Sequence, residues 1–429
     1  MRTRGLVVLA AGMMLAVLSA GGLFAGGQGQ QPVKKYVIQN RMTSGDLLAL
    51  TNSLIEQFNK SHPGIVFENS PVPAEKQEEL LYVAYSGGNP PLVAWTTMAQ
   101  SAVLNQRGLI ADMRPAYAKY GWDARIPTAA KSVWTDKTGV VYGAPFDGGI
   151  YPFLHYNAAL FKELGIARPA HDVPLNISDF MKILDRIKAA GVYPITLGNR
   201  HEWTLEHIVR LVMQQSLPPD QGAALWTDLN GPRMTDPKPL EALRRLAGLL
   251  RSDYFAPGIN SMSDDEARML LYSKKAAIYT IGMWWPMMVT SDKMADKFEA
   301  DFMLFPKMFD DVPYNMSASM HGWTAAKSGD VTTAAELIDW LINLENQKQY
   351  AKLGTSTVIK GAVTAETAAL PIVTEYYKVM DKVVGLNTEP NESMILSTRK
   401  IVAALVDPNV RVEDIAAQLQ KAKEEVYKK

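Results

Sequence analysis

Hydrophobic residues near the start of the chain alternate between the period of a strand and the period of a helix. Short apolar and β-branched runs predict strands, and apolar residues three and four positions apart predict helices. Proline and glycine follow these segments, as at 62–64, where they end a helix. The predicted order is strand, helix, strand, helix, strand, over residues 36–39, 47–59, 65–68, 74–85 and 91–95. This order is typical of a parallel sheet covered by helices.

The same alternation continues to the end of the chain. Further strands are predicted at 139–143, 153–156, 194–197, 276–280 and 302–306. Ser178 is a candidate N-cap for one of the later helices. Helices are predicted at 98–106, 158–164, 177–190, 204–215, 239–251, 264–272, 334–345 and 412–427. The pattern therefore predicts an α/β protein.

The first 25 residues have the order of a secretory signal: basic, then apolar, then small. The apolar run at 6–18 is too short to span a bilayer, which takes about 20 residues. A cleaved signal peptide is therefore favoured over an anchor helix that stays in the membrane. We place cleavage after Ala25, with Ala20 as the alternative site. Residues 26–32 then form a flexible spacer.

Composition limits the class of protein further. The chain has 429 residues, which favours two lobes over one domain. Its formal net charge is +0, which gives no reason to expect a nucleic-acid partner. There is no cysteine, which excludes disulfides, cysteine-bound metals and thiol nucleophiles, and also the residue to which a lipoprotein anchor is attached. We expect a soluble exported monomer without a lipid anchor.

Sequence motifs of the common enzyme classes are missing. The chain has no Walker phosphate loop, no dinucleotide-binding glycine motif and no nucleophile elbow. His201-Glu202 begins like the zinc-binding helix of a metalloprotease, but Leu205 stands where the second histidine is needed. We therefore expect no metal, no cofactor and no enzymatic activity.

Three of the nine tryptophans stand where predicted strands end or loops begin: Trp95, Trp203 and Trp284. Ligands of open α/β sheets bind outside the carboxyl ends of the strands. An indole there offers a flat apolar face that suits a pyranose ring. The polar residues near these positions are candidates for hydrogen bonds to sugar hydroxyls: Asp147, Asn199, His201 and Glu202. Core packing stays the alternative for each tryptophan alone, and a turn role for Asp147.

Five motifs occur in a fixed order along the chain. They are residues 54–65, 141–149 followed by 155–161, 276–284, 305–306 and 336–353. In this order they resemble segments of the family 1 extracellular solute-binding proteins, which are the sugar-binding subunits of ABC importers. The resemblance covers nearly the whole chain after the signal peptide.

This resemblance implies a type II periplasmic-binding fold with two α/β lobes, three chain crossings and a ligand cleft at the hinge. Lobe one would comprise 33–147 and 306–355, and lobe two 148–305 and 356–429. The implied function is the capture of a mono- or oligosaccharide by cleft closure, followed by delivery to the membrane permease subunits of an importer. The protein would act in the periplasm or elsewhere outside the cytoplasmic membrane.

Only some of the candidate ligand contacts fall on positions that match the family's motifs. Asp147 and Trp284 fall on motif positions, whereas Trp95 and Trp203 fall in loops that vary within the family. Trp323 stands where the family has small residues, so it is either a ligand contact or hinge packing. Trp285 is also unusual and is the weaker candidate of the Trp284-Trp285 pair.

Two other functions stay open. The same fold can bind an anion, a polyamine or a metal, and Arg200 beside the expected site keeps an anion open. A carbohydrate-active enzyme would need two positioned carboxylates, for which Asp147 and Glu202 are the only candidates.

Overall fold

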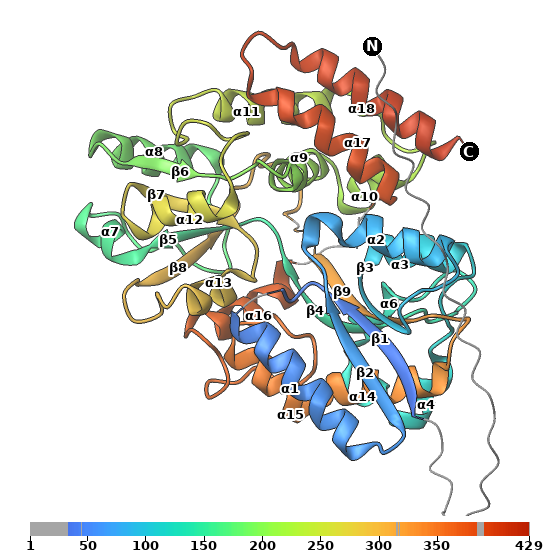
Figure 1. Cartoon of the computed structure of the whole chain (residues 1–429). Helices are drawn as coiled ribbons and strands as arrows, with labels where there is room; N and C mark the ends of the chain where they lie inside the picture. Colours follow the sequence, from blue (N-terminus) through green and yellow to red (C-terminus); the bar gives the residue numbers. More distant parts are fainter. Residues whose placement is uncertain (1–32, 44, 315, 317, 384–389, 429) are drawn as a thin grey trace, which may run out of the picture.

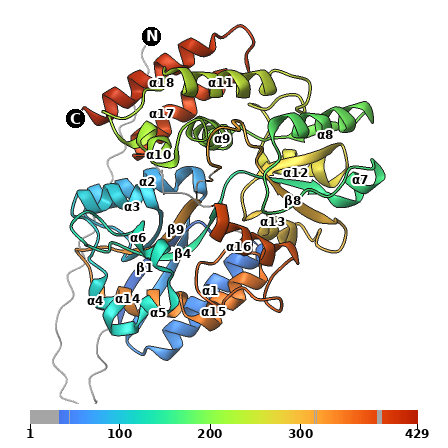
Figure 2. The ribbon, with the colours of Figure 1, turned by 180° about the vertical axis from the view of Figure 1, so that it is seen from behind.

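Two β-sheets organise the chain, which the computed structural model describes over residues 33–43, 45–314, 316, 318–383 and 390–428. Each sheet has helices packed around it, and the two resulting lobes meet near the middle of the molecule (Figures 1 and 2). The expected signal peptide and spacer lie outside the described residues. Among the described helices, none has both the length and the apolar character needed to cross a membrane. The predicted α/β class with two lobes is confirmed.

The first lobe contains a five-stranded sheet in the order β2-β1-β3-β9-β4. Strand β1 pairs in parallel with β2 and β3, whereas β9 runs antiparallel to β3 and β4. The strands are β1 (Lys34–Asn40), β2 (Ile65–Pro71), β3 (Val93–Thr97), β4 (Ala144–Ile150) and β9 (Ala318–Ala325). The helices are α1 (Gly45–Ser61), α2 (Ala74–Ser86), α3 (Met98–Gln106), α4 (Arg114–Tyr120), α5 (Trp122–Arg125), α6 (Thr128–Ser132), α14 (Val331–Leu341) and α15 (Leu344–Lys352).

The second lobe contains a four-stranded sheet in the order β6-β7-β5-β8. Strands β6 and β7 are parallel, and β5 runs antiparallel to both β7 and β8. The strands are β5 (Phe153–Asn157), β6 (Tyr193–Thr196), β7 (Ala276–Ile281) and β8 (Ala300–Leu304). The helices are α7 (Ala158–Glu163), α8 (Ile177–Ala189), α9 (Trp203–Gln214), α10 (Pro219–Thr227), α11 (Pro237–Leu250), α12 (Asp264–Tyr272), α13 (Trp285–Ser291), α16 (Ile372–Val383), α17 (Glu392–Val402) and α18 (Val412–Tyr427).

Each sheet has its own hydrophobic core. The main core of the first lobe takes its buried side chains from residues 38–146 and 323–362. The core of the second lobe takes them from residues 151–316 and 370–422. The buried side chains of each set pack against one another, so each lobe has a separate apolar interior. Separate interiors are a condition for rigid-body movement of one lobe against the other.

Three segments of backbone connect the lobes, and they lie side by side. Strand β4 pairs with the start of β9, where Gly149 faces Ser319. The third segment, at 355–358, lies on the other side of β4, because the N–H of Gly148 donates to the carbonyl of Ser356 at 2.9 Å. The three crossings therefore form one small hydrogen-bonded unit between the two cores.

Several sequence-based expectations for single elements were wrong. Residues 139–143 form only an isolated bridge between Thr135 and Val141, and the strand begins at Ala144. The N-cap of α8 is Asn176 instead of Ser178, and its side chain accepts from the N–H of Asp179. The expected helix at 334–345 is two helices, because Asn343 caps a new one. Strand β9 was not predicted at all.

The glycine at 322 generates a test of the first sheet. A Cβ atom on Gly322 would lie 2.5 Å from the carbonyl oxygen of Ala144 in the neighbouring strand. Because a backbone atom cannot move aside easily, we expect Gly322→Ala to lower the free energy of unfolding in urea by about 1–3 kcal/mol. As the control, Gly248→Ala on the exposed side of α11 meets no atom within 4 Å and is expected to add about 0.5–1 kcal/mol. Equal stability of the two variants would contradict this account of β9.

Candidate functional site

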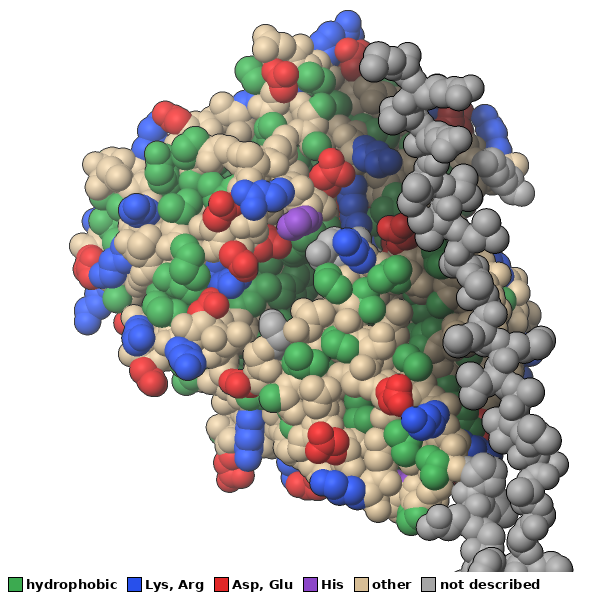
Figure 3. Space-filling view, viewed as in Figure 1, with side chains coloured by type: hydrophobic (Ala, Val, Ile, Leu, Met, Phe, Trp, Pro, Cys, Tyr) green, Lys and Arg blue, Asp and Glu red, His purple; other side chains and the backbone are tan. Residues whose placement is uncertain are grey.

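The carboxyl ends of the parallel strands of both lobes lie toward the junction of the lobes (Figure 1). The molecular surface is hollowed at this junction, and hydrophobic side chains line the hollow (Figure 3). In α/β sheets this edge is where ligands bind, because loops and helix starts collect there. The hollow is therefore the candidate binding cleft.

One side of the cleft is an aromatic wall, which we define as Tyr151, Trp203 and Trp284. The rings of Tyr151 and Trp284 are stacked, with centroids 5.6 Å apart and an interplanar angle of 11°. Trp203 lies 5.6 Å from Tyr151 and 5.8 Å from Trp284. Both tryptophans are partly exposed, whereas Tyr151 is buried behind them. Two of the three predicted tryptophans thus come together in the second lobe.

Hydrogen bonds at the start of α9 hold the aromatic wall in place. The Tyr151 hydroxyl donates to the carbonyl of Thr204 at 3.0 Å. The Nδ1 atom of His207 lies 2.8 Å from the carbonyl oxygen of Trp203, and the imidazole meets the Tyr151 ring edge to face at 5.0 Å. Because these groups are fixed by the helix start, the indole of Trp203 needs little reordering before a ligand arrives.

A buried ion pair lies directly behind the wall. The Glu206 carboxylate is fully buried, 2.7 Å from Nδ1 of His207 and 3.2 Å from Nε of Arg210. Burial alone would raise the pKa of Glu206, but the charges of Arg210 and His207 lower it to about 2. The carboxylate is therefore ionised at neutral pH and keeps these two side chains beneath the aromatic wall.

The opposite side of the cleft belongs to the first lobe and is polar. The Arg41 guanidinium lies 4.6 Å from the centroid of the Trp95 ring, and the His321 ring lies 4.2 Å from it. Nδ1 of His321 is 2.6 Å from Oδ1 of Asp147. Trp95 is only 4% exposed, so it supports Arg41 and His321 and offers little surface of its own. We call Arg41, Asp147 and His321 the polar wall.

Three of the residues predicted as ligand contacts have packing positions in this structure. Trp285 is 0% exposed in the core of the second lobe, and Trp323 is 0% exposed in the core of the first. Asn199 is also buried, and its Oδ1 accepts from the N–H of Leu205 at 3.0 Å and the Thr204 hydroxyl at 2.9 Å. These residues shape the cleft from behind, since none has an exposed face.

The predicted pair His201 and Glu202 lies in the loop that leads into α9. His201 is exposed and Glu202 is partly buried with a φ of 61°. The neighbouring Arg200 is paired with Glu266 at 2.7 Å. Arg200, the cation that kept an anion site open in the sequence, therefore already has a carboxylate partner.

Sequence reasoning missed three residues of the site: Tyr151, Arg41 and His207. Tyr151 follows the crossing segment and Arg41 follows β1, so neither belongs to a tryptophan motif. His207 is one turn after Trp203, and that helical spacing was a usable signal. Among the described residues, no group of three or more His, Asp or Glu side chains has the arrangement of a metal site.

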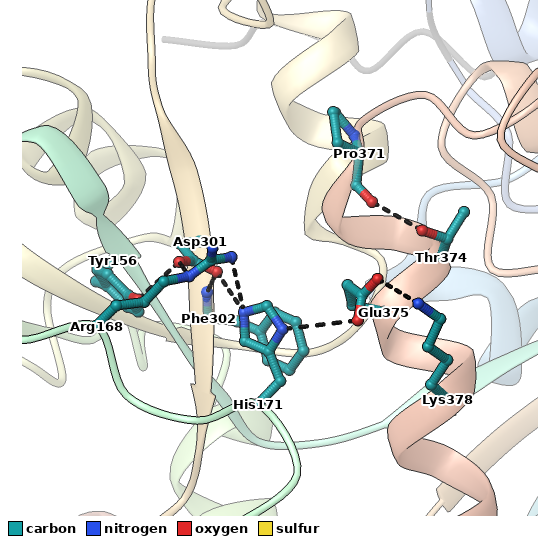
Figure 4. A network of polar contacts seen from close by, with 9 residues as sticks. All are labelled: Tyr156, Arg168, His171, Asp301, Phe302, Pro371, Thr374, Glu375 and Lys378. Carbon is teal, nitrogen blue, oxygen red and sulfur yellow. Dashed lines mark hydrogen bonds and ion pairs between the residues drawn. The ribbon is translucent and has the colours of Figure 1, made fainter.

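A second concave region lies between residues 168–171 and the start of α16. Its cavity volume is about 560 Å³, and its lining includes Arg168, His171 and Glu375. Asp301 is 4% exposed and is 2.6 Å from Nε of Arg168 and 2.7 Å from Nε2 of His171. The side chains of Arg168 and His171 point inward to Asp301, and Glu375 reaches His171 from α16 (Figure 4). Because these groups are engaged with one another, the network ties α16 to β8.

The fold and the two unlike walls define a two-lobed ligand receptor. The family model for bacterial extracellular solute-binding proteins matches residues 53–375. The chain belongs to this family.

The chain also has relatives in sequence and solved structures that share its fold. A probable sugar-binding periplasmic protein of Mesorhizobium japonicum is 23% identical over 259 residues, which cover 59% of this chain and 58% of that protein. The match thus spans less than two thirds of the curated relatives' length. A chitin oligosaccharide binding protein superposes with a TM-score of 0.80 at 18% identity, over 91% of this chain and 98% of that one. The solute receptor AcbH, reported to prefer β-D-galactopyranose, superposes with a TM-score of 0.80 at 16% identity, over 92% and 99%.

The Asp301 network generates a prediction on stability and pH. Burial alone would raise the pKa of Asp301, but hydrogen bonds from His171, Tyr156 and Arg168 hold it below its ordinary value of 3.8. Asp301→Asn is therefore expected to lower the free energy of unfolding by about 1.5–3 kcal/mol at pH 7. The stabilisation is present above the ordinary pKa and is lost as the pH falls through the lower folded-state pKa, so the deficit shrinks in acid.

Urea unfolding of both proteins at pH 7 and near pH 3 measures this difference. Asp311→Asn is the matched control, because this exposed aspartate forms only a surface pair with Lys238. A deficit of Asp301→Asn that did not change with pH would show that the carboxylate charge is irrelevant to the network.

Proposed function

We propose that this protein is an exported receptor that captures a carbohydrate in the cleft and delivers it to an ABC importer. The observation that carries the proposal is the pairing of an aromatic wall on one lobe with a polar wall on the other. The names of the curated and structural relatives, which include sugar-binding and chitin oligosaccharide binding proteins, support the same ligand class.

The two walls match the two kinds of surface on a pyranose ring. The apolar C–H face would lie on Trp203 and Trp284, where an aromatic contact is worth roughly 0.5–1.5 kcal/mol beyond the area that it buries. The ring hydroxyls would face Asp147, His321 and Arg41. Because each wall belongs to a different lobe, a sugar makes its full set of contacts only when the lobes approach, and binding then favours the closed form.

We propose that the lobes move as the units defined by their cores. The division expected from the sequence, 33–147 with 306–355 and 148–305 with 356–429, then needs two adjustments. Side chains between 308 and 316 pack in the core of the second lobe, and those at 359 and 362 in the core of the first. The three crossing segments absorb the change in angle between the lobes.

The site of action and the partners belong to the same proposal. A signal peptide cleaved after Ala25 would release a soluble monomer into the periplasm or an equivalent space. The closed, sugar-loaded form would then bind the permease subunits of the importer. The lack of cysteine supports release without a lipid anchor, and the relatives are receptors instead of enzymes.

A sugar panel tests the proposed function. Galactose and the chito-, xylo- and malto-oligosaccharides are added to the protein, and the melting temperature and tryptophan fluorescence are recorded. A sugar at 100 times its dissociation constant should stabilise the fold by about 2.7 kcal/mol. If phosphate or a polyamine raises the melting temperature and no sugar does, the ligand class is wrong.

Trp284→Ala tests the aromatic wall. We expect it to weaken sugar binding about 10- to 100-fold, because it removes about 1.5–3 kcal/mol of apolar contact. The partly exposed position predicts that the variant still folds. The control is Trp340→Phe, since Trp340 is also partly buried but lies in α14, where its indole donates to the carbonyl of Leu54. Titration calorimetry should show affinity lost in the first variant and kept in the second.

A further inference from the structure

Helix α17 of the second lobe packs against helix α3 of the first lobe (Figures 1 and 2). The two helices belong to different interiors. Met394 and Val402 of α17 lie in the core of the second lobe, whereas Met98 and Leu104 of α3 pack with Trp134 in a smaller core cluster of the first. Neither helix is part of the three crossing segments. A rotation of one lobe against the other would therefore separate α17 from α3.

One face of α3 is apolar and turns away from the core of its own lobe. Ala99, Ala102 and Val103 lie on this face, three and four positions apart. Of the described side chains of α3, Met98 and Leu104 pack in the core of the first lobe, and these three do not. Ala99 is nevertheless buried, and Ala102 and Val103 are partly buried. Another part of the molecule therefore covers this face of α3.

Helix α17 has a face that matches it, with Glu392 and Ile395 one turn apart. Ile395 is only 3% exposed, yet among the described residues it is not part of the core that takes up the neighbouring Met394. Glu392 is buried although it is charged and stands in the first turn of the helix. Burial has the largest effect in raising the pKa of the Tyr82 hydroxyl on α2, and the charges of Glu78 and Glu392 raise it further. This face of α17 is therefore directed at the first lobe.

We propose that the contact between α17 and α3 is a latch for the closed form, in which Ile395 packs on the face formed by Ala99, Ala102 and Val103. Ile395 is then a positioning residue, because it contacts the first lobe instead of the ligand and favours the form in which the two walls approach. Helix α17 also packs on α9, which begins with Trp203, so the latch and the aromatic wall move together. The inference rests on the proposed function for the identity of the ligand, and it adds a determinant of affinity besides the two walls.

Ile395→Ala tests the latch through the kinetics of ligand binding. The substitution removes three buried carbon atoms from the contact, so we expect the dissociation rate to rise about 10-fold while the association rate stays nearly unchanged. Stopped-flow fluorescence measures both rates with whichever of chitotriose, xylotriose, maltotriose or galactose binds the wild type. The matched control is Leu396→Ala, because Leu396 is the next residue of α17 and is 39% exposed. The control should keep both rates.

A double-mutant cycle separates a contact between the lobes from a local defect in α17. Val103→Ala alone is expected to raise the dissociation rate about 3-fold. Combined with Ile395→Ala, it should raise the rate by less than the product of the two single effects, because side chains in contact are coupled. Urea unfolding checks that each variant is folded. If Ile395→Ala does not fold, Val103→Ala still tests the latch, since Val103 lies outside the core of its own lobe.

Distances between two spin labels report the closure of the lobes directly. The chain has no cysteine, so labels attach only at Gln106→Cys on α3 and Lys400→Cys on α17, which are both exposed positions. The binding sugar should increase the population with the shorter distance, and Ile395→Ala should shift the free protein towards the longer distance. Unchanged label distances and an unchanged dissociation rate in Ile395→Ala would overturn the inference. If no sugar binds the wild type, the proposed function fails, and the label distances of the two free proteins still decide whether the latch exists.

Discussion

The pairing of three backbone segments between the lobes is the constraint on which the site depends. Strand β4, the start of β9 and residues 355–358 pair side by side, so each wall is anchored to the same small unit. Two glycines make this possible: a Cβ atom on Gly148 would lie 2.7 Å from Met320, and one on Gly149 would lie 2.8 Å from Met283. Asp147 and Tyr151 stand at either end of the same crossing. A change of angle in this unit therefore moves the polar wall and the aromatic wall relative to each other.

The two lobes contribute different kinds of side chain to the cleft. The aromatic wall is assembled from the second lobe, where parallel β6 and β7 place the starts of α9 and α13 side by side. The polar wall uses Trp95 as a support, and the Arg41 guanidinium and the His321 ring lie against it. An indole buried in this way fixes the positions of the Arg41 and His321 side chains at the edge of the sheet. In the proposed function either wall alone would be an incomplete site, and ligand affinity would therefore be coupled to lobe closure.

Local sequence patterns predicted most helices and strands but not the tertiary contacts between them. The periodicity of apolar residues predicts α12 and α18, and capping boxes fix the starts of α3 and α12. Strand β9 was not predicted because Gly322 interrupts the short alternation of apolar and polar residues in 318–325, and pairing with β3 and β4 on both sides stabilises the strand. Trp284 and Trp285 show the same limit. The sequence favoured Trp284 over Trp285, but only tertiary packing shows that the second indole belongs to the core.

The two carboxylates beside Trp203 show how burial alone does not decide a residue's role. Glu206 and Asp264 both lie next to this residue and both lose solvent, yet the pKa of Glu206 falls to about 2 while that of Asp264 rises to about 7. Burial pushes both upward, and only Glu206 has cations close enough to reverse the effect. Glu206 therefore has its partners within the protein and acts as support for the wall. Among the described residues, Oδ1 of Asp264 and both carboxylate oxygens of Glu206 are shielded from solvent without a well-aligned hydrogen bond. The charge of the neighbouring side chains, and not hydrogen bonding, therefore separates the two carboxylates.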